Sequence, residues 1–199
     1  PGFYTTDDRL FATVGARGFS RPNDFNNRML LMVDGNTVND NAFGAAAMGP
    51  ELPLEMEAIE RVEIVRGPGS ALYGTGAVFA IVNVITRTGQ QVDGVRVSAS
   101  SGSFGHREVS GVAGVQRGKL DVMLSALWSE SDGQRFDFPE LTGIPGNSGV
   151  ADRQNWDRRT GLLGTARVGG FRFMGRVSER TYGVLSPGLA DGRGFLNAS

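Results

Sequence analysis

Alternation of residues with period two in the second half of the chain is the feature that most constrains its fold. Residues 120–129 and 171–182 alternate with period two, and weaker alternation runs through residues 92–101, 107–116 and 160–168. This period is typical of β-strands, whose successive side chains point to opposite faces. Each stretch has about 9–12 residues, the length that a tilted membrane-spanning β-strand needs.

The connections between these stretches also alternate in length. Arg117-Gly118 and Gly169-Gly170 predict tight hairpin turns, whereas residues 131–158 form a long connection rich in Gly, Pro, Asp and Asn. Short turns on one side and long loops on the other are typical of an outer-membrane barrel, and Trp128 near a strand end suits an aromatic girdle. A soluble antiparallel sheet with one buried face gives the same alternation. Periodicity alone therefore leaves both interpretations open. Five strands cannot close a membrane barrel, which takes about eight, so a barrel would make the chain a fragment.

The first part of the chain has short apolar runs between turn signals instead. Residues 28–33 form a nearly continuous apolar run that stops at Asp34-Gly35, as in a buried strand that leaves through a turn. Residues 61–66 alternate and stop at Gly67-Pro68-Gly69, and residues 81–85 are a last β-rich run. These patterns predict a mixed α and β domain.

Composition argues against most enzyme classes. The chain of 199 residues is 40% hydrophobic and 21% charged, with a net charge of −1. This balance disfavours a disordered chain and a basic nucleic-acid binder. Without Cys, and with His106 as the single His, the chain has too few side chains for a His- or thiolate-bound zinc site or a Ser-His-Asp triad. We expect no enzymatic activity, no metal, no cofactor and no nucleic-acid partner.

Four segments together form a recognisable pattern. Residues 59–74 read IERVEIVRGPGSALYG and residues 77–86 read AVFAIVNVIT. Upstream, Ala16-Arg17-Gly18-Phe19 and Met32-Val33-Asp34-Gly35 stand in the matching order. Over residues 10–88 the chain closely resembles the plug domain of TonB-dependent outer-membrane receptors.

The Gly-rich part of this pattern also has a local interpretation. Gly67-Pro68-Gly69 gives a sharp exit from a strand, because Gly permits unusual dihedral angles and Pro removes a donor. Ser70 is expected to cap a short helix that ends at Gly74. The spacing from Gly69 to Gly74 fits GxxxxG, but Thr75-Gly76 stands where a phosphate-binding loop needs Lys-Ser/Thr. Nucleotide binding is therefore not expected.

The resemblance implies a mixed α/β plug domain over residues 1–90, with its N-terminal part missing, and the antiparallel strands of an incomplete transmembrane β-barrel over residues 91–199. It also implies location in the outer membrane of a Gram-negative bacterium, contact with the lipid membrane, and a monomer at full length. The implied function is capture and import of a scarce solute, most commonly a ferric siderophore, energised by a TonB-type protein. Cobalamin, haem or carbohydrate are alternative cargoes.

Two other classes of function stay open beside the energised importer. One is a surface binding or signalling receptor on the same scaffold without coupled transport, and the other is a soluble β-rich protein whose plug match is coincidental. Cargo uptake that needs the proton gradient would indicate the importer rather than the uncoupled receptor. Recovery in the soluble fraction without detergent would support the second.

The resemblance also suggests functional residues. Arg17 and Arg66 match arginines that in the family face the inner barrel wall and pair with barrel glutamates, so they are expected to lock plug to barrel. Cargo is expected to touch outward plug loops at residues 4–7, 20–25 and 39–43, where turn chemistry explains the polar residues equally well. Arg21 offers forked donors for an anionic siderophore and the aromatic residues offer stacking surfaces. The expected contacts are Tyr4, Arg21, Asn23, Phe25, Asp40 and Phe43.

Overall fold

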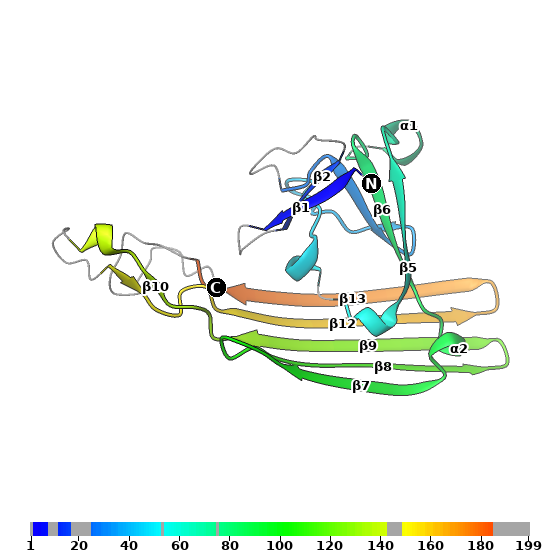
Figure 1. Ribbon diagram of the computed structural model, residues 1–199. Coiled ribbons are helices and arrows are strands. Elements are labelled where there is room, and N and C mark those ends of the chain that lie inside the picture. The colour runs from blue at the N-terminus through cyan, green and yellow to red at the C-terminus, as the bar shows by residue number, and fades with distance from the viewer. Residues whose placement is uncertain are drawn as a thin grey trace.

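The computed structural model describes residues 2–7, 12–16, 25–52, 54–74, 76–142 and 149–184. A small mixed sheet with short helices lies over one face of a long antiparallel sheet, and the strands of the two sheets run across each other (Figure 1). The small sheet comes from the first part of the chain and the long sheet from the second. The predicted fold class, a mixed α/β domain followed by antiparallel strands, is confirmed.

The small sheet has the strand order β4-β3-β6-β5. Its strands are β3 (Met29–Val33), β4 (Asn36–Thr37), β5 (Ile59–Arg66) and β6 (Ala80–Thr86). At the centre β3 and β6 are parallel, and every residue of β3 is buried. This explains the apolar run in the sequence, because a strand covered on both faces needs no polar side. A separate hairpin pairs β1 (Phe3–Asp7) with β2 (Ala12–Ala16).

Short helices connect these strands. They are η1 (Gly49–Glu51), η2 (Met56–Ala58), α1 (Ser70–Tyr73) and α2 (Gly89–Val92). The predicted Ser70 cap of α1 is wrong, since Gly69 occupies the N-cap position and the Ser70 hydroxyl donates to the Ala77 carbonyl oxygen at 3.1 Å. Among the described residues, no helix combines the length and apolar character needed to cross a membrane.

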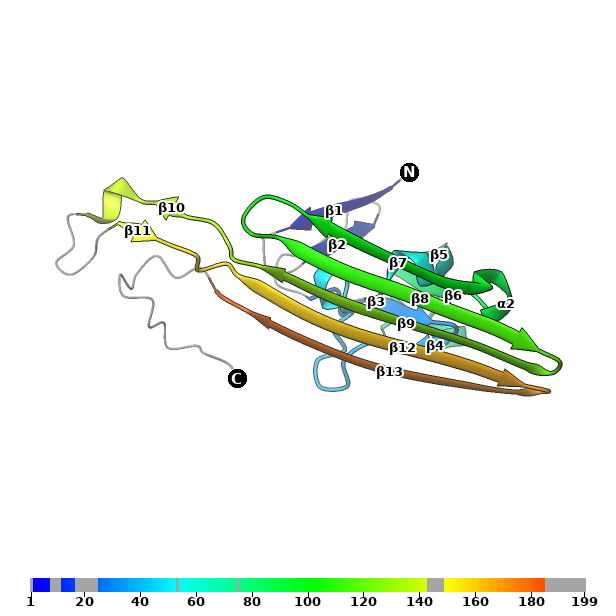
Figure 2. The same ribbon diagram turned by 90° about the horizontal axis from the view of Figure 1, so that it is seen from below.

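The long sheet has the order β13-β12-β9-β8-β7, and its neighbouring strands are antiparallel. Turns at residues 118–119 and 169–170 join strands at one end. At the other end a long connection, with the small pair β10 (Phe136–Asp137) and β11 (Val150–Ala151) and the turn η3 (Pro139–Leu141), extends beyond the sheet (Figure 2). The long strands are β7 (Gly94–Ser101), β8 (Arg107–Arg117), β9 (Leu120–Ser131), β12 (Asp157–Val168) and β13 (Phe171–Tyr182).

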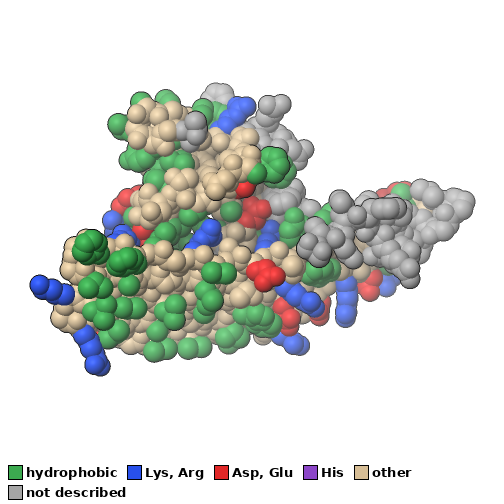
Figure 3. All heavy atoms as spheres, turned by 180° about the vertical axis from the view of Figure 1, so that it is seen from behind, with side chains coloured by type: hydrophobic (Ala, Val, Ile, Leu, Met, Phe, Trp, Pro, Cys, Tyr) green, Lys and Arg blue, Asp and Glu red, His purple; other side chains and the backbone are tan. Residues whose placement is uncertain are grey.

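The two faces of the long sheet differ in character. On the face turned away from the small sheet, called the outer face below, Leu124, Trp128 and Leu162 are between 42% and 54% exposed. On the inner face, Met123 and Leu163 are buried in the same apolar cluster as β3 and β6. Figure 3 shows hydrophobic side chains spread over the long sheet. An exposed face that is apolar rather than polar favours contact with lipid over a soluble sheet.

Candidate functional site

Helix α2 joins the first domain to the inner face of the long sheet. Thr88 caps it: its Oγ1 accepts a hydrogen bond from the Gln91 backbone N–H at 3.1 Å, and the Gln91 Oε1 accepts one from the Thr88 N–H at 2.7 Å. The next two amides, of Gly89 and Gln90, both donate to the Asp121 carboxylate on β9 at 2.9 Å. A carboxylate at a helix N-terminus is stabilising. Asp121 therefore fastens α2 to the long sheet.

Close packing at α2 leaves space only for glycine at two positions. A Cβ on Gly89 would lie 2.2 Å from the Val122 carbonyl oxygen and 2.5 Å from that of Val115. On β8, a Cβ on Gly114 would lie 2.6 Å from the Cβ of Val92, whose side chain is buried. The backbone of α2 therefore rests directly on β8 and β9.

Asp34, the residue after β3, forms a second connection. Its Oδ1 accepts from the Thr86 backbone N–H at 2.9 Å, and its Oδ2 accepts from the Thr86 hydroxyl at 2.5 Å. The same Oδ2 lies 2.7 Å from the Arg172 Nη2 on β13. The Asp34 side chain is 1% exposed and that of Arg172 is 37% exposed. One buried carboxylate thus ties the central strands β3 and β6 to the long sheet.

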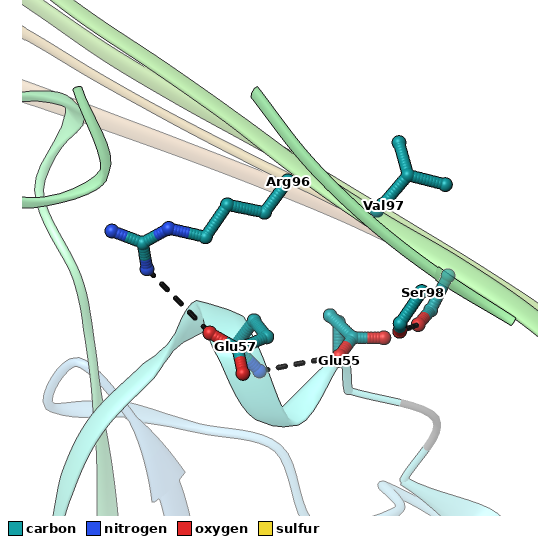
Figure 4. A pocket seen from close by; sticks show the side chains of 7 residues that line it. Glu55, Glu57, Arg96, Val97 and Ser98 are labelled. Atoms are coloured by element: carbon teal, nitrogen blue, oxygen red, sulfur yellow. Dashed lines mark hydrogen bonds and ion pairs between the residues drawn. The ribbon is translucent and has the colours of Figure 1, made fainter. Parts of the chain in front are cut away.

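A small polar pocket between η2, β7 and β8 forms a third contact (Figure 4). Glu57 Oε2 lies 3.5 Å from Arg96 Nη1 on β7, and both side chains are about half exposed. Glu55 is buried, and its Oε1 accepts from the Glu57 backbone N–H at 3.2 Å, which caps η2. Across the pocket the hydroxyls of Ser98 and Ser110 are 2.7 Å apart. The contact between the domains therefore combines polar groups with apolar packing.

The predicted lock between plug and barrel rests on Arg17 and Arg66. Arg66 ends β5, opposite Ala80, and its side chain is exposed; Arg17 lies outside the described residues. The pairing of both with barrel glutamates stays a prediction. In the two ion pairs described above the charges are reversed, since Asp34 and Glu57 of the first domain meet arginines of the long sheet.

Tyr4 lies in a strand, so the expectation that residues 4–7 form a loop is wrong. They belong to β1, where Tyr4 stands opposite Gly15 of β2. A Cβ on Gly15 would lie 2.2 Å from the Tyr4 ring, and the ring, 40% exposed, covers this glycine. Residues 4–7 are extended because β2 supplies the partner for their backbone groups, which a single segment of sequence does not reveal.

Phe25 is presented by a turn that Asn26 stabilises. Phe25 is 48% exposed, whereas Asn26 is 4% exposed. The Asn26 Oδ1 accepts from the Val14 N–H at 2.8 Å, and its Nδ2 donates to the carbonyl oxygens of Ala12 at 2.8 Å and Ala46 at 3.3 Å. Asn26 thus joins β2 to the loop that follows β4. No pattern in the sequence marks Asn26 for this role.

Asp40 and Phe43 lie in the loop that follows β4, and they have different roles there. The Asp40 carboxylate accepts from the backbone N–H groups of Ala42 at 3.1 Å and Phe43 at 2.8 Å. These two hydrogen bonds, first that from Ala42, hold the pKa of Asp40 below its ordinary value. Phe43 is 79% exposed. Asp40 therefore shapes the loop, and Phe43 is the side chain that the loop presents.

The structure brings Phe25 and the Phe43 loop together, because the Ala46 N–H donates to the Phe25 carbonyl oxygen at 3.1 Å. Arg21 and Asn23 lie outside the described residues, so their contacts with cargo stay predictions. Within the described ranges no cluster of three or more His, Asp or Glu side chains is placed to hold a metal ion. Asp34 and Asn26 are the residues that sequence reasoning missed, since only turn signals mark them.

The fold and these contacts define a class: a folded domain fastened to the inner face of a β-sheet whose other face suits lipid, as in a membrane barrel with a plug. Residues 1–81 match the family model described as the TonB-dependent Receptor Plug Domain. This part of the chain is thus a plug domain of the TonB-dependent receptor type.

Similar proteins agree with this assignment. The vitamin B12 transporter BtuB of Vibrio cholerae serotype O1 is 34% identical over 153 residues, which cover 77% of this chain and 23% of that protein. The iron-regulated outer membrane virulence protein of the same species is 33% identical over 95 residues, 46% of this chain and 14% of that one. The crystal structure of the ferric yersiniabactin uptake receptor FyuA from Yersinia pestis matches with a TM-score of 0.60 and 23% identity, over 90% of this chain and 27% of that chain.

The chain therefore spans about a quarter of the length of the B12 transporter and of the solved receptor. The names of these similar proteins describe a transporter, an outer membrane protein and an uptake receptor. The expected outer-membrane location in a Gram-negative bacterium and the expected non-enzymatic role are confirmed.

Proposed function

We propose that the whole receptor binds a scarce solute at the cell surface and imports it, energised by a TonB-type protein of the inner membrane. The observation that carries the proposal is the seating of the plug on the inner face of the long sheet, through α2, Asp34 and a shared apolar core. A plug held in this way closes a pore at rest. Import then requires work on the plug, which an energy-transducing partner supplies.

The plug presents its cargo surface through aromatic side chains. Tyr4, Phe25 and Phe43 are all at least 40% exposed, and aromatic rings bury large area with few rotatable bonds. Arg21 and Asn23 belong to the same proposed surface. Asp40 contributes by shaping the Phe43 loop, so we assign it a positioning role.

A ferric siderophore is the proposed cargo, and vitamin B12 is the second candidate. The names of FyuA and of the iron-regulated protein of Vibrio cholerae favour the first. The match of 77% of this chain to proteins named vitamin B12 transporters favours the second. Both cargoes are bulky metal complexes with planar groups, which suits an aromatic surface.

Uptake by the whole receptor tests the proposal. Cells that lack other receptors would express it and be given radiolabelled ferric siderophores or cyanocobalamin, with and without a protonophore. Uptake that the protonophore abolishes supports an energised importer and identifies the cargo. Binding without protonophore-sensitive uptake would replace import by surface binding or signalling.

A variant of the aromatic surface refines this test. Phe43→Ala removes a ring that cargo would bury, so we expect about tenfold weaker binding. Asn36→Ala, an exposed change at the first residue of β4, serves as the control. Equal affinity of the two variants would remove Phe43 from the cargo surface.

A further inference from the structure

The outer face of the long sheet ends in a row of charged side chains. Arg107 on β8, Glu130 on β9 and Arg158 on β12 stand directly opposite one another in register. Ser101 on β7 and Thr181 on β13 complete the same line across the sheet. The three charged residues, called the arginine row here, lie at the end that carries the long connection, which in membrane barrels is the extracellular end.

The face below the arginine row is an apolar band. On β9, Trp128 lies two residues before Glu130 on the same face. Leu124 and Leu120 continue this face toward the other end of the strand, and all three are at least 42% exposed. The stretch from Leu120 to Trp128 spans about 27 Å along the strand, or about 21 Å across a membrane at a tilt of about 40°. This is close to the height of about 25 Å of the apolar band of outer-membrane barrels. Arg117 closes the band at the other end.

The arginine row therefore lies just outside the hydrocarbon layer. It is about 5 Å further from the membrane centre than Trp128, by the same rise and tilt. Neighbouring strands at this tilt differ in depth by about 3 Å, so Arg107 and Arg158 differ by about 6 Å. The headgroup layer on each side of a bilayer is about 5–7 Å thick. Both guanidinium groups are consequently placed among lipid headgroups.

Both arginines are oriented but open to solvent. The Arg107 Nη1 is 3.7 Å from the Glu130 Oε1, and its side chain is 72% exposed. Such a long, exposed ion pair holds the guanidinium only weakly. The exposed Arg158 guanidinium lies over the Trp156 ring, 5.5 Å from its centroid, on the side away from the apolar band. Stacking on an aromatic ring leaves the forked N–H donors of Arg free for another acceptor.

We propose that the arginine row binds phosphate groups of the outer-leaflet lipid. Guanidinium groups match phosphate oxygens with paired hydrogen bonds, and basic residues beside a membrane attract anionic headgroups. Two strand spacings separate Arg107 and Arg158 by about 10 Å, which suits two phosphate groups of one headgroup or of adjacent lipids. Glu130 keeps the two guanidinium groups apart. Glu179 lies two residues before Thr181 on the same face of β13, closer to the apolar band. Its negative charge favours approach of the phosphate from the outward side.

The test compares the whole receptor with two double variants. Arg107→Gln with Arg158→Gln removes the two cations of the row, and Arg117→Gln with Lys119→Gln removes the same charge at the opposite end of the sheet. Each protein is purified in mild detergent, its fold is checked by heat-modifiable migration, and bound lipid A is measured by mass spectrometry. Transfer to nanodiscs of lipid A or of phosphatidylcholine, followed by thermal unfolding, gives a second readout.

We expect the first variant to retain about 10- to 30-fold less lipid A, on the scale of two basic residues beside an anionic surface. It should also lose the stabilisation that lipid A nanodiscs give over phosphatidylcholine. The second variant and Arg107→Lys with Arg158→Lys should keep most bound lipid. Equal lipid A on all variants, or equal loss from both Gln variants, would overturn the proposal. The test measures bound lipid and thermal stability rather than cargo uptake. The lipid proposal can therefore fail while the proposed transport function holds, and the reverse.

Discussion

The outer face of the long sheet and the contact between plug and sheet are built by different means. On the outer face each residue is set by its own place in a period of two, as the line Leu120, Leu124 and Trp128 on β9 shows. At the contact, a few polar residues from distant parts of the chain meet, as Asp34 meets Arg172. In the first region the cost of a charged substitution therefore rises with its depth in the membrane, whereas the second region depends on single groups.

The largest effect is expected at the junction between α2 and the sheet. Gly89→Ala places a Cβ within 2.5 Å of two backbone carbonyl oxygens, which cannot rotate away. Overpacking of this kind costs about 3 kcal/mol or more, so we expect loss of heat-modifiable receptor from the outer membrane. Gly170→Ala, where a Cβ has nothing within 4 Å, is the control. Normal amounts of folded Gly89→Ala receptor would show that the junction is looser than described.

Arg172→Gln should lower the free energy of unfolding by about 3–5 kcal/mol, because it leaves the buried Asp34 carboxylate without its cation. Asp34→Asn should cost less, since Arg172 is more exposed and keeps access to water. Denaturant unfolding of the whole receptor measures both changes. The double variant should recover part of the loss.

Arg135→Gln supplies the comparison for this pair. Arg135 and Asp137 are 62% and 63% exposed, and such a surface pair contributes about 1 kcal/mol or less. If Arg172→Gln were as mild as Arg135→Gln, the contact between plug and sheet would rest on apolar packing alone.

Leu124→Arg tests the opposite region. An arginine at the middle of the lipid-facing band costs about 2–4 kcal/mol, falling to about 0–1 kcal/mol near the interface. Leu120→Arg, at the end of the same strand, is the matched variant and should be the milder of the two. Unfolding in lipid bilayers measures the difference. Equal costs at both depths would argue against a membrane-facing sheet.

Asn26→Ala should cost about 1–3 kcal/mol, because it leaves the Val14 N–H and two carbonyl oxygens without a side-chain partner. The loss should be local, with faster hydrogen exchange in β2 and unchanged exchange in β9. Asn36→Ala, at an exposed residue whose side-chain contacts are 3.4 Å or longer, is expected to change little. Uniform loss of protection in both sheets would mean that plug and barrel unfold as one unit.

The sequence predicts the long sheet well and the plug contacts poorly, for physical reasons. The predicted stretch 171–182 is β13 as observed, because alternation is a local property that the pleat of a strand imposes. Asp34-Gly35 is correctly predicted as a turn, yet nothing nearby indicates Arg172, which lies on the last described strand. Tyr4 shows the same limit, since its strand depends on pairing with β2.

The smallest expected effect is the pH response of the Phe43 loop. Hydrogen bonds from Ala42 and Phe43 lower the pKa of Asp40 below its ordinary value of 3.8. A carboxyl group whose pKa is lower in the folded loop stabilises that loop fully above the ordinary value, and the contribution is lost as pH falls through the folded pKa. The loop should therefore be unchanged from pH 7 to about pH 4 and loosen only in more acidic solution.

Amide hydrogen exchange at Ala42 and Phe43, corrected for the intrinsic dependence of exchange on pH, measures this response. Asp40→Asn keeps a carbonyl acceptor without a titrating group, so its corrected protection should be weaker at neutral pH and flat on acidification. The Gly44 N–H, which donates to the Asp40 backbone oxygen at 2.9 Å, is the internal reference and should respond less. A loss of protection that sets in well above pH 4, or one that Asp40→Asn shares, would assign the response to another group and leave Asp40 without its positioning role.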